Sequence, residues 1–371
     1  MHKKIIALAV AGLLSGGAFA QSNVSIYGIV DLYGAHRTAD NARAQNGVDS
    51  GGLATSRIGF KGEEALGNGL SAVFTLEYGL DVDKNTGVGA TAHMARQQFV
   101  GLKSGSLGTL VAGRLQGLSY YTVAAFAGGV GGGPLSPLAS LQTSANNGTA
   151  TVGALQASIT RFNNGIAYTS PNFAGFDFGA AYSFGNRASG AEATTADTRD
   201  SVYELGANYK NGPIAAGYVF SRAVDKLLAG GSDDLKLNAH FLGASYDFGL
   251  AKLKASFQTQ KNETGGSESG KFDIWQLGVD VPVTAAGTIR AAYVAYNDKF
   301  DTRKADDAKS WTVGYTHALS KRTTAYAAYT VVRNDNNAGL KLFGSGDTVT
   351  GMAPVAGGDS SVIGCGVSHA F

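Results

Sequence analysis

Apolar and polar residues alternate with a period of two along most of the chain after Gln21, a pattern that predicts β-strands with unlike faces. In residues 252–260 (KLKASFQTQ), lysine, serine and glutamine side chains share one face, and leucine, alanine, phenylalanine and threonine share the other. No helical stripe competes with this pattern. The chain is therefore expected to be all-β.

Seven short turn signals interrupt the alternation, at residues 63–69, 103–108, 170–175, 210–213, 247–250, 283–287 and 318–322. Their centres are about 35 to 40 residues apart, except for one interval of about 66 residues. Each ordinary interval holds two strands of about 10 to 13 residues and one longer polar loop. Seven turns join fourteen strands, and a first strand from Val24 and a last strand ending at Phe371 make sixteen.

An even strand number, with short turns at one end and long loops at the other, is typical of a bacterial outer-membrane barrel. Strands of this length can cross a membrane when tilted, and closure removes the exposed sheet edges. The alternative is a secreted soluble β protein, whose inward faces would be apolar. Because the inward faces here carry Lys, Gln, Asp and Arg, we predict a sixteen-stranded antiparallel transmembrane β-barrel with a water-filled interior.

Residues 1–20 have the three parts of a secretory signal peptide: a basic start, an apolar segment and an Ala-Phe-Ala cleavage site. The alternative is a buried N-terminal helix. Removal of residues 1–20 leaves 21–371 as the barrel, with equal numbers of basic and acidic residues, so net charge says nothing about partners. Glycine is abundant, with 53 residues, and the single cysteine, Cys365, excludes an internal disulfide and is expected on the lipid-facing side.

Motifs for catalysis and for metal or cofactor binding are missing or weak. The six histidines form no H-E-x-x-H pair, and no G-x-S-x-G motif is present. A dinucleotide-like match at residues 87–92 falls in an expected loop, and one calcium-roll-like copy at residues 230–234 cannot build a roll. We expect no enzyme activity, cofactor, metal or nucleic-acid partner, although a hydrolase carried on a barrel stays an alternative.

Three arginines on alternate predicted strands are the candidate functional residues. Arg57, Arg96 and Arg161 each precede a short turn by about six to nine residues, which places them about 14 to 21 Å above the short-turn end. Alternation directs all three into the lumen if the neighbours on the opposite face meet lipid: Ile58, Phe60, Gln97, Phe99, Ile166 and Tyr168. Such a ladder attracts anions, whereas an ordinary solvated or acid-paired arginine is the alternative for each one.

The long interval contains a loop, residues 116–158, without a single Asp, Glu, Lys or Arg. Loops of this length are usually functional or disordered. Tyr120, Tyr121 and Phe126 offer packing surface, and the glycines at 128–133 allow bending. Folded into the barrel, the loop would narrow the pore and add no carboxylate opposite the arginines; the alternative is a loop on the outer surface.

The ordered motifs resemble those of the Gram-negative general porins, especially the betaproteobacterial branch. The resemblance covers nearly the whole of residues 21–371. Its specific pieces are residues 22–31 (SNVSIYGIVD), 56–63 (SRIGFKGE), 96–102 (RQQFVGL), 108–114 (GTLVAGR), 161–171 (RFNNGIAYTSP), 319–322 (LSKR) and the terminal Phe371.

The resemblance implies a homotrimer of sixteen-stranded barrels in the outer membrane, among lipid and lipopolysaccharide, with the third long loop folded inward as the constriction. Arg57, Arg96 and Arg161 match the basic cluster of such porins, and Phe371 matches their assembly signal. Arg114 matches a family arginine, but its parity suggests an outward or interface position. We expect a passive channel for small hydrophilic solutes with anion preference; a plugged barrel serving as adhesin or anchor is the rival.

Overall fold

The computed structural model describes residues 23–40, 42–85, 87–88, 95–133, 135–144, 161–185, 201–225, 235–300, 306–342 and 355–371. The predicted signal peptide and the last part of the predicted constriction loop lie outside these residues. Seventeen strand segments are present in the described part: β1 (Asn23–Ala39), β2 (Gln45–Ser50), β3 (Arg57–Gly67), β4 (Leu70–Gly79), β5 (Ala95–Ser104), β6 (Gly108–Gln116), β7 (Arg161–Thr169), β8 (Phe176–Ser183), β9 (Ser201–Asn211), β10 (Ile214–Asp225), β11 (Leu235–Asp247), β12 (Lys252–Thr264), β13 (Ser267–Pro282), β14 (Gly287–Asp298), β15 (Ala308–Ala318), β16 (Thr323–Asn334) and β17 (Ser360–Ala370).

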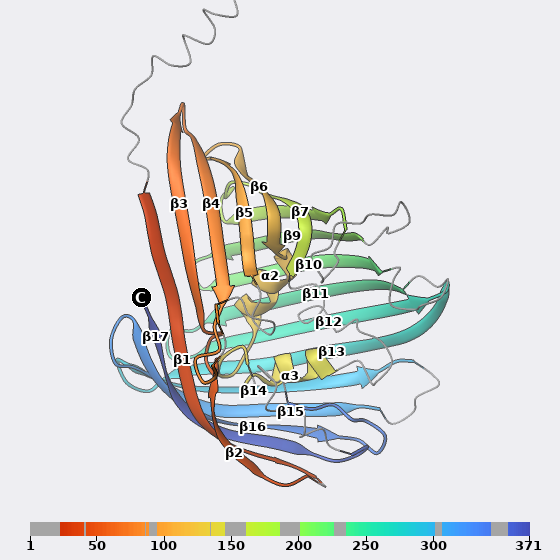
Figure 1. Ribbon diagram of the computed structural model, residues 1–371. Coiled ribbons are helices and arrows are strands. Elements are labelled where there is room, and N and C mark those ends of the chain that lie inside the picture. The colour runs from red at the N-terminus through yellow and green to blue at the C-terminus, as the bar shows by residue number, and fades with distance from the viewer. Residues whose placement is uncertain are drawn as a thin grey trace, which may run out of the picture.

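The segments form one closed antiparallel barrel of sixteen strands, as predicted (Figure 1). The count is sixteen because β2 and β3 are two parts of the second strand: both pair with β1, β2 with residues 32–37 and β3 with residues 23–29. Every other strand pairs with its neighbours in chain order, and β17 pairs with β1 to close the ring. All seven predicted short turns join the expected strand pairs.

The C-terminus takes part in closing the barrel. Phe371 exchanges two backbone hydrogen bonds with Gly28 of β1, at 3.2 and 3.1 Å. The ring of Phe371 also covers Gly28, where a Cβ atom would meet the ring at 2.3 Å. A side chain at position 28 would therefore displace the terminal aromatic residue from the seam.

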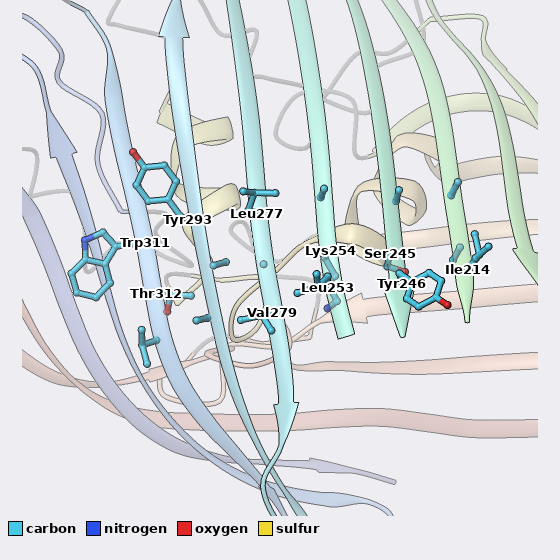
Figure 2. Close-up of a pocket in the computed structure, with 18 residues that line it drawn as sticks. Ile214, Ser245, Tyr246, Leu253, Lys254, Leu277, Val279, Tyr293, Trp311 and Thr312 are labelled. Carbon is cyan, nitrogen blue, oxygen red and sulfur yellow. The ribbon is translucent and has the colours of Figure 1, made fainter. Parts of the chain in front are cut away.

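The outward face of the barrel is apolar. Large hydrophobic side chains with high exposure, such as Leu277 at 58 % and Ile363 at 56 %, alternate along each strand with buried inward residues. Cys365 is exposed on this face of β17. An apolar groove of about 780 Å³ crosses β10 to β15, and Figure 2 shows Tyr246, Leu253 and Trp311 among the side chains around it.

The interior holds the long loop that follows β6. Its helices, α2 (Leu118–Phe126) and α3 (Pro137–Ser144), lie inside the strands in Figure 1, with α2 packed against β8 to β12 and α3 against β13 to β16. None of the helices in the described part of the chain is both long enough and apolar enough to cross a membrane.

The expectation of polar inward faces needs a correction on this wall. Val219, Phe241, Ile274 and Val294 point inward and are at most 1 % exposed, because the loop helices pack over them. Burial of such side chains against the loop contributes about 1.5–3 kcal/mol each. The described helices of the loop are thus a packed lining of one wall, and the three predicted arginines lie on other strands, β3, β5 and β7.

Candidate functional site

The helix α2 packs closely against the wall because two strands carry glycine beneath it. A Cβ atom at Gly217 of β10 or Gly243 of β11 would lie 2.7 or 2.4 Å from the ring of Phe126. Phe126 itself is 4 % exposed. The Phe126 ring therefore lies against β10 and β11 at the C-terminal end of α2.

Polar wall residues hold the backbone just after α2. The Gln276 side chain accepts a hydrogen bond from the Gly128 N–H (3.0 Å) and donates one to the Phe126 carbonyl (2.8 Å). The Lys254 ammonium donates to the Ala127 carbonyl (3.1 Å) and pairs with Asp280 at 3.1 Å. Although the loop has no charged residue of its own, charged wall residues fix its path.

The beginning of α2 is capped by the wall and not by its own sequence. Gly117, at the N-cap position, offers no side-chain hydrogen bond, and the first turn has no acidic residue. The buried carboxylate of Glu204 on β9 accepts the Ser119 N–H (3.3 Å) and the Ser221 hydroxyl (2.9 Å). A carboxylate at this end satisfies an orphan N–H and complements the helix dipole.

Arg57 opens β3, and alternation directs it inward as expected. Its Nε donates to the Thr55 carbonyl at 3.1 Å. The preceding segment is held by Asp31 of β1, whose carboxylate accepts backbone N–H groups from Gly52 (2.9 Å) and Ala54 (3.0 Å). The second strand is interrupted here, and Asp31 fixes the interruption next to Arg57.

The facing expected for Arg96 rests on a wrong assumption. Alternation was expected to put Gln97 and Phe99 on the lipid side, opposite Arg96. In β5, however, the exposed apolar side chains are Val100, at 62 %, and Leu102, whereas Phe99 packs against the buried cluster. Simple alternation would therefore turn Arg96 outward.

A β-bulge brings Arg96 back to the interior. The register between β4 and β5 shifts next to Glu77: Glu77 pairs with Gln97, and Arg96 has no partner across the strands. Its Nε donates to Glu77 Oε1 at 2.6 Å, and both side chains are less than 10 % exposed. The second carboxylate oxygen of Glu77 accepts the Tyr27 hydroxyl at 3.0 Å.

Glu77 was missed in the sequence. It is the only charged residue between positions 65 and 80, in the strand between those of Arg57 and Arg96. A single charged residue in an otherwise uncharged stretch is a sequence signal for a functional role. The ion pair between Glu77 and Arg96, however, depends on the β-bulge. Because Glu77 forms an ion pair with Arg96, the positive charge of Arg96 is partly balanced by a carboxylate on the same wall of the barrel.

Arg161 opens β7 at the base of the loop. Its Nη2 donates to the Gln116 side chain at 3.3 Å, and its guanidinium carbon lies 5.5 Å from the centroid of the Tyr120 ring, a cation–π contact. Ile166 is exposed as expected, but Asn164 has φ 48°, so alternation does not run unbroken to Arg161.

The two tyrosines of α2 face the arginine wall. Tyr120 and Tyr121 make an edge-to-face pair with ring centroids 5.8 Å apart. The Tyr121 hydroxyl donates to the Gln97 side chain at 3.2 Å, and Tyr121 is 52 % exposed. The loop therefore touches the arginine wall at two points, Arg161 and Gln97.

The structure brings the three predicted arginines together. Arg96 interacts electrostatically with both Arg57 and Arg161. Arg114 lies next to Arg161, and its guanidinium donates to the Ala95 carbonyl (2.6 Å) and the Asn163 side chain (2.5 Å). The cluster thus has three guanidinium groups and one carboxylate, and the described part of the loop adds no charge.

Comparison with known proteins identifies the class. A family model described as Gram-negative porin matches residues 7–337, and the chain belongs to this family. It is similar to outer membrane porin protein 32 of Delftia acidovorans, 35 % identical over the full length of both chains. It is also similar to an outer membrane porin protein of Bordetella pertussis, 27 % identical over both full lengths.

Solved structures give the same result. The anion-selective porin from Comamonas acidovorans matches with a TM-score of 0.78 and 28 % identity, covering 94 % of this chain and all of that one. OmpT of Vibrio cholerae, at 14 % identity and a TM-score of 0.65, shows the shared fold alone. The chain is therefore a betaproteobacterial-type diffusion porin of the outer membrane.

Proposed function

We propose that this porin is a passive channel for small hydrophilic solutes that prefers anions, and that Arg57, Arg96 and Arg161 set the preference. The observation that carries the proposal is the charge balance of the cluster: three guanidinium groups, one carboxylate, and a facing loop without charge. The relative in the structural comparison that is titled anion-selective supports it.

The mechanism is electrostatic and needs no reaction. Solutes pass between the arginine wall and the loop, where the low-dielectric loop and barrel focus the positive potential. An anion is attracted into this neck and a cation is repelled, while water-filled space lets both diffuse. The relatives are porins, which are channels and not enzymes.

The wider setting is part of the same proposal. We propose that residues 1–20 direct export, that Phe371 is read during barrel assembly, and that three copies associate in the membrane with lipid and lipopolysaccharide around them. Tyr120, Tyr121 and Phe126 then hold the constriction loop, residues 116–158, in place. The contacts of Phe126 with the wall and of Tyr120 with Arg161 support this part.

The direct test is the reversal potential of the purified protein in a planar bilayer with a KCl gradient. We expect the sign that reports chloride permeating faster than potassium. Because surface charges are screened over about 8–10 Å in ordinary salt, the preference should weaken as salt rises from 0.1 to 1 M. Cation preference would contradict the proposed selectivity but not the proposal that the protein is a channel. Absence of any current would favour a plugged barrel.

Glu77→Gln should increase the anion preference. The change removes the one carboxylate of the cluster and keeps an acceptor for Tyr27. A unit charge about 8 Å from the ion path contributes about 0.5 kcal/mol in water for each ion, with opposite sign for chloride and potassium, so the chloride-to-potassium permeability ratio should rise about fivefold. The matched control is Glu63→Gln, which removes an exposed carboxylate paired with Lys103 at the short-turn end. Equal effects of both variants would contradict the role of Glu77.

A further inference from the structure

The arginine cluster has aromatic neighbours to which the electrostatic mechanism gives no role in solute choice. Tyr120 and Tyr121 belong to α2, and Tyr27 belongs to β1. Tyr27 and Tyr121 interact electrostatically with each other, and both interact with Glu77. The two rings therefore border the same neck from different sides, Tyr27 from the barrel wall and Tyr121 from the loop.

Tyr121 points away from the wall that α2 covers. The buried residues of this helix are spaced as one helical face: Ser119, Thr122, Val123 and Phe126. Tyr121 lies on the opposite face and is 52 % exposed. Because half of this side chain stays open to the lumen, packing of the loop alone does not account for an aromatic residue at this position.

Two contacts hold the Tyr121 ring in one orientation. Its hydroxyl donates to the Gln97 side chain of β5 at 3.2 Å, and its ring meets Tyr120 edge to face at 5.8 Å between the centroids. Tyr120 in turn contacts the guanidinium group of Arg161. A ring that is already fixed can bind a solute without a further loss of side-chain freedom.

The arginine wall carries a second flat aromatic surface. The Tyr27 ring lies on the backbone of β3 at Gly59, where a Cβ atom would meet the ring at 2.4 Å. Gly59 stands between Arg57 and Lys61 on the inward face of this strand. The Lys61 ammonium lies 5.2 Å from the centroid of the Tyr27 ring. An aromatic ring on this wall is thus flanked by two cations.

Arg57 offers an open anion-binding group beside these rings. Within the described residues, its hydrogen bond is the one from Nε to the Thr55 carbonyl, and its two Nη groups make none. Arg57 is also partly exposed, whereas Arg96 is buried and held by Glu77. The N–H groups of a guanidinium match the two oxygens of a carboxylate. Arg57 is therefore the member of the cluster best placed to bind a passing carboxylate.

We propose that the neck selects aromatic carboxylates of the benzoate type over saturated carboxylates of the same size. The carboxylate bonds to Arg57, and the aromatic ring of the solute stacks against the exposed side of Tyr121, with Tyr27 across the neck. The proposal rests on the proposed function, because it takes the space between the arginine wall and the loop as the ion path. Aromatic pairs gain stability beyond the burial of apolar area, which a saturated ring of equal size does not.

An attraction of this size speeds passage and does not block the channel. Conduction requires that a solute bind well enough to enter the neck and weakly enough to leave it. One contact between aromatic rings changes an equilibrium by about threefold. We therefore expect an aromatic carboxylate to permeate about threefold faster than its saturated counterpart.

The test sets the two anions against each other in one recording. Potassium benzoate stands on one side of a planar bilayer, and potassium cyclohexanecarboxylate stands on the other at the same concentration and at neutral pH, where both acids are ionised. Because the potassium concentration is equal on both sides, a reversal potential different from zero shows that the two anions permeate unequally. We expect the sign that reports benzoate permeating faster through the wild-type protein.

Three variants assign the effect to the ring of Tyr121. Tyr121→Leu removes the aromatic ring and keeps apolar bulk, so the benzoate preference should fall from about threefold to about one. Tyr121→Phe restores the ring without the bond to Gln97, so it should recover a preference of about twofold or more. The matched control, Tyr246→Leu, removes a tyrosine that is 42 % exposed on the outward face of β11, and it should keep the wild-type preference.

Equal permeation of the two anions through the wild type contradicts the aromatic site, and so does a benzoate preference that survives in Tyr121→Leu. A KCl gradient applied to the same membranes separates this proposal from the proposed function. Chloride preference with equal permeation of the two carboxylates contradicts the aromatic site alone. Potassium preference in a wild type that still favours benzoate supports the aromatic site and contradicts the proposed selectivity.

Discussion

Replacing Arg57, Arg96 and Arg161 together by glutamine should remove the anion preference and leave a conducting channel. Each arginine within about 8 Å of the ion path contributes about 0.5 kcal/mol in a water-like medium, so the three together contribute about 1.5 kcal/mol. Chloride loses this attraction and potassium loses an equal repulsion, a difference of about 3 kcal/mol; because 1.4 kcal/mol corresponds to a factor of ten, the chloride-to-potassium permeability ratio should fall about a hundredfold. The measurement is the reversal potential in a KCl gradient.

The control for this triple variant replaces Lys210, Lys321 and Arg322, which are exposed near the short turns and carry the same total charge. Since they lie outside the neck, we expect their loss to change the ratio by less than twofold. An effect of the control as large as that of the arginine variant would show that net charge, and not the cluster, sets the preference.

Loss of Arg96 leaves the buried carboxylate of Glu77 without its ion pair, which costs stability. A second variant therefore adds Glu77→Gln to the three arginine replacements. It should fold better than the triple variant and still show weak selectivity. An anion preference that survives in a folded form of both variants contradicts the proposed role of the cluster.

Period-two alternation and turn chemistry predicted the strand number and all seven short turns. These features depend on neighbours in the chain. The facing of Arg96 depends on a bulge opposite Glu77, which no local pattern reveals. A one-residue slip moves a side chain to the other face of a strand, so an unseen bulge reverses the inference from alternation.

Contacts between residues far apart in the chain could not be predicted either, because no local pattern shows which distant residues meet. Asp31 accepts the N–H of Gly52 and also the hydroxyl of Tyr326, 295 positions away in the chain. Gly217 and Gly243 leave room for the Phe126 ring. From the sequence alone they are only small residues on strands. The apolar loop and its length were visible in the sequence, but the wall that it covers was not.

Glu204→Leu should release the beginning of α2 from the wall. The leucine keeps the bulk of the side chain but leaves the Ser119 N–H without its acceptor at the start of the helix. Loss of a helix cap costs about 1 kcal/mol, which would make undocked states of α2 about five times more populated. We expect single-channel recordings to show more open-channel noise and more frequent conductance steps than the wild type.

Two variants separate docking of α2 from general damage to the barrel. Glu204→Gln keeps one acceptor oxygen and should behave nearly as the wild type, whereas Ser221→Ala removes the other hydrogen bond and leaves the contact with α2. The barrel itself is checked by its resistance to unfolding in detergent, because the strand ladders do not depend on the Glu204 side chain. Quiet, wild-type recordings from a well-folded Glu204→Leu protein would contradict the role of this carboxylate, since Phe126 and Gln276 alone would then suffice to hold the loop.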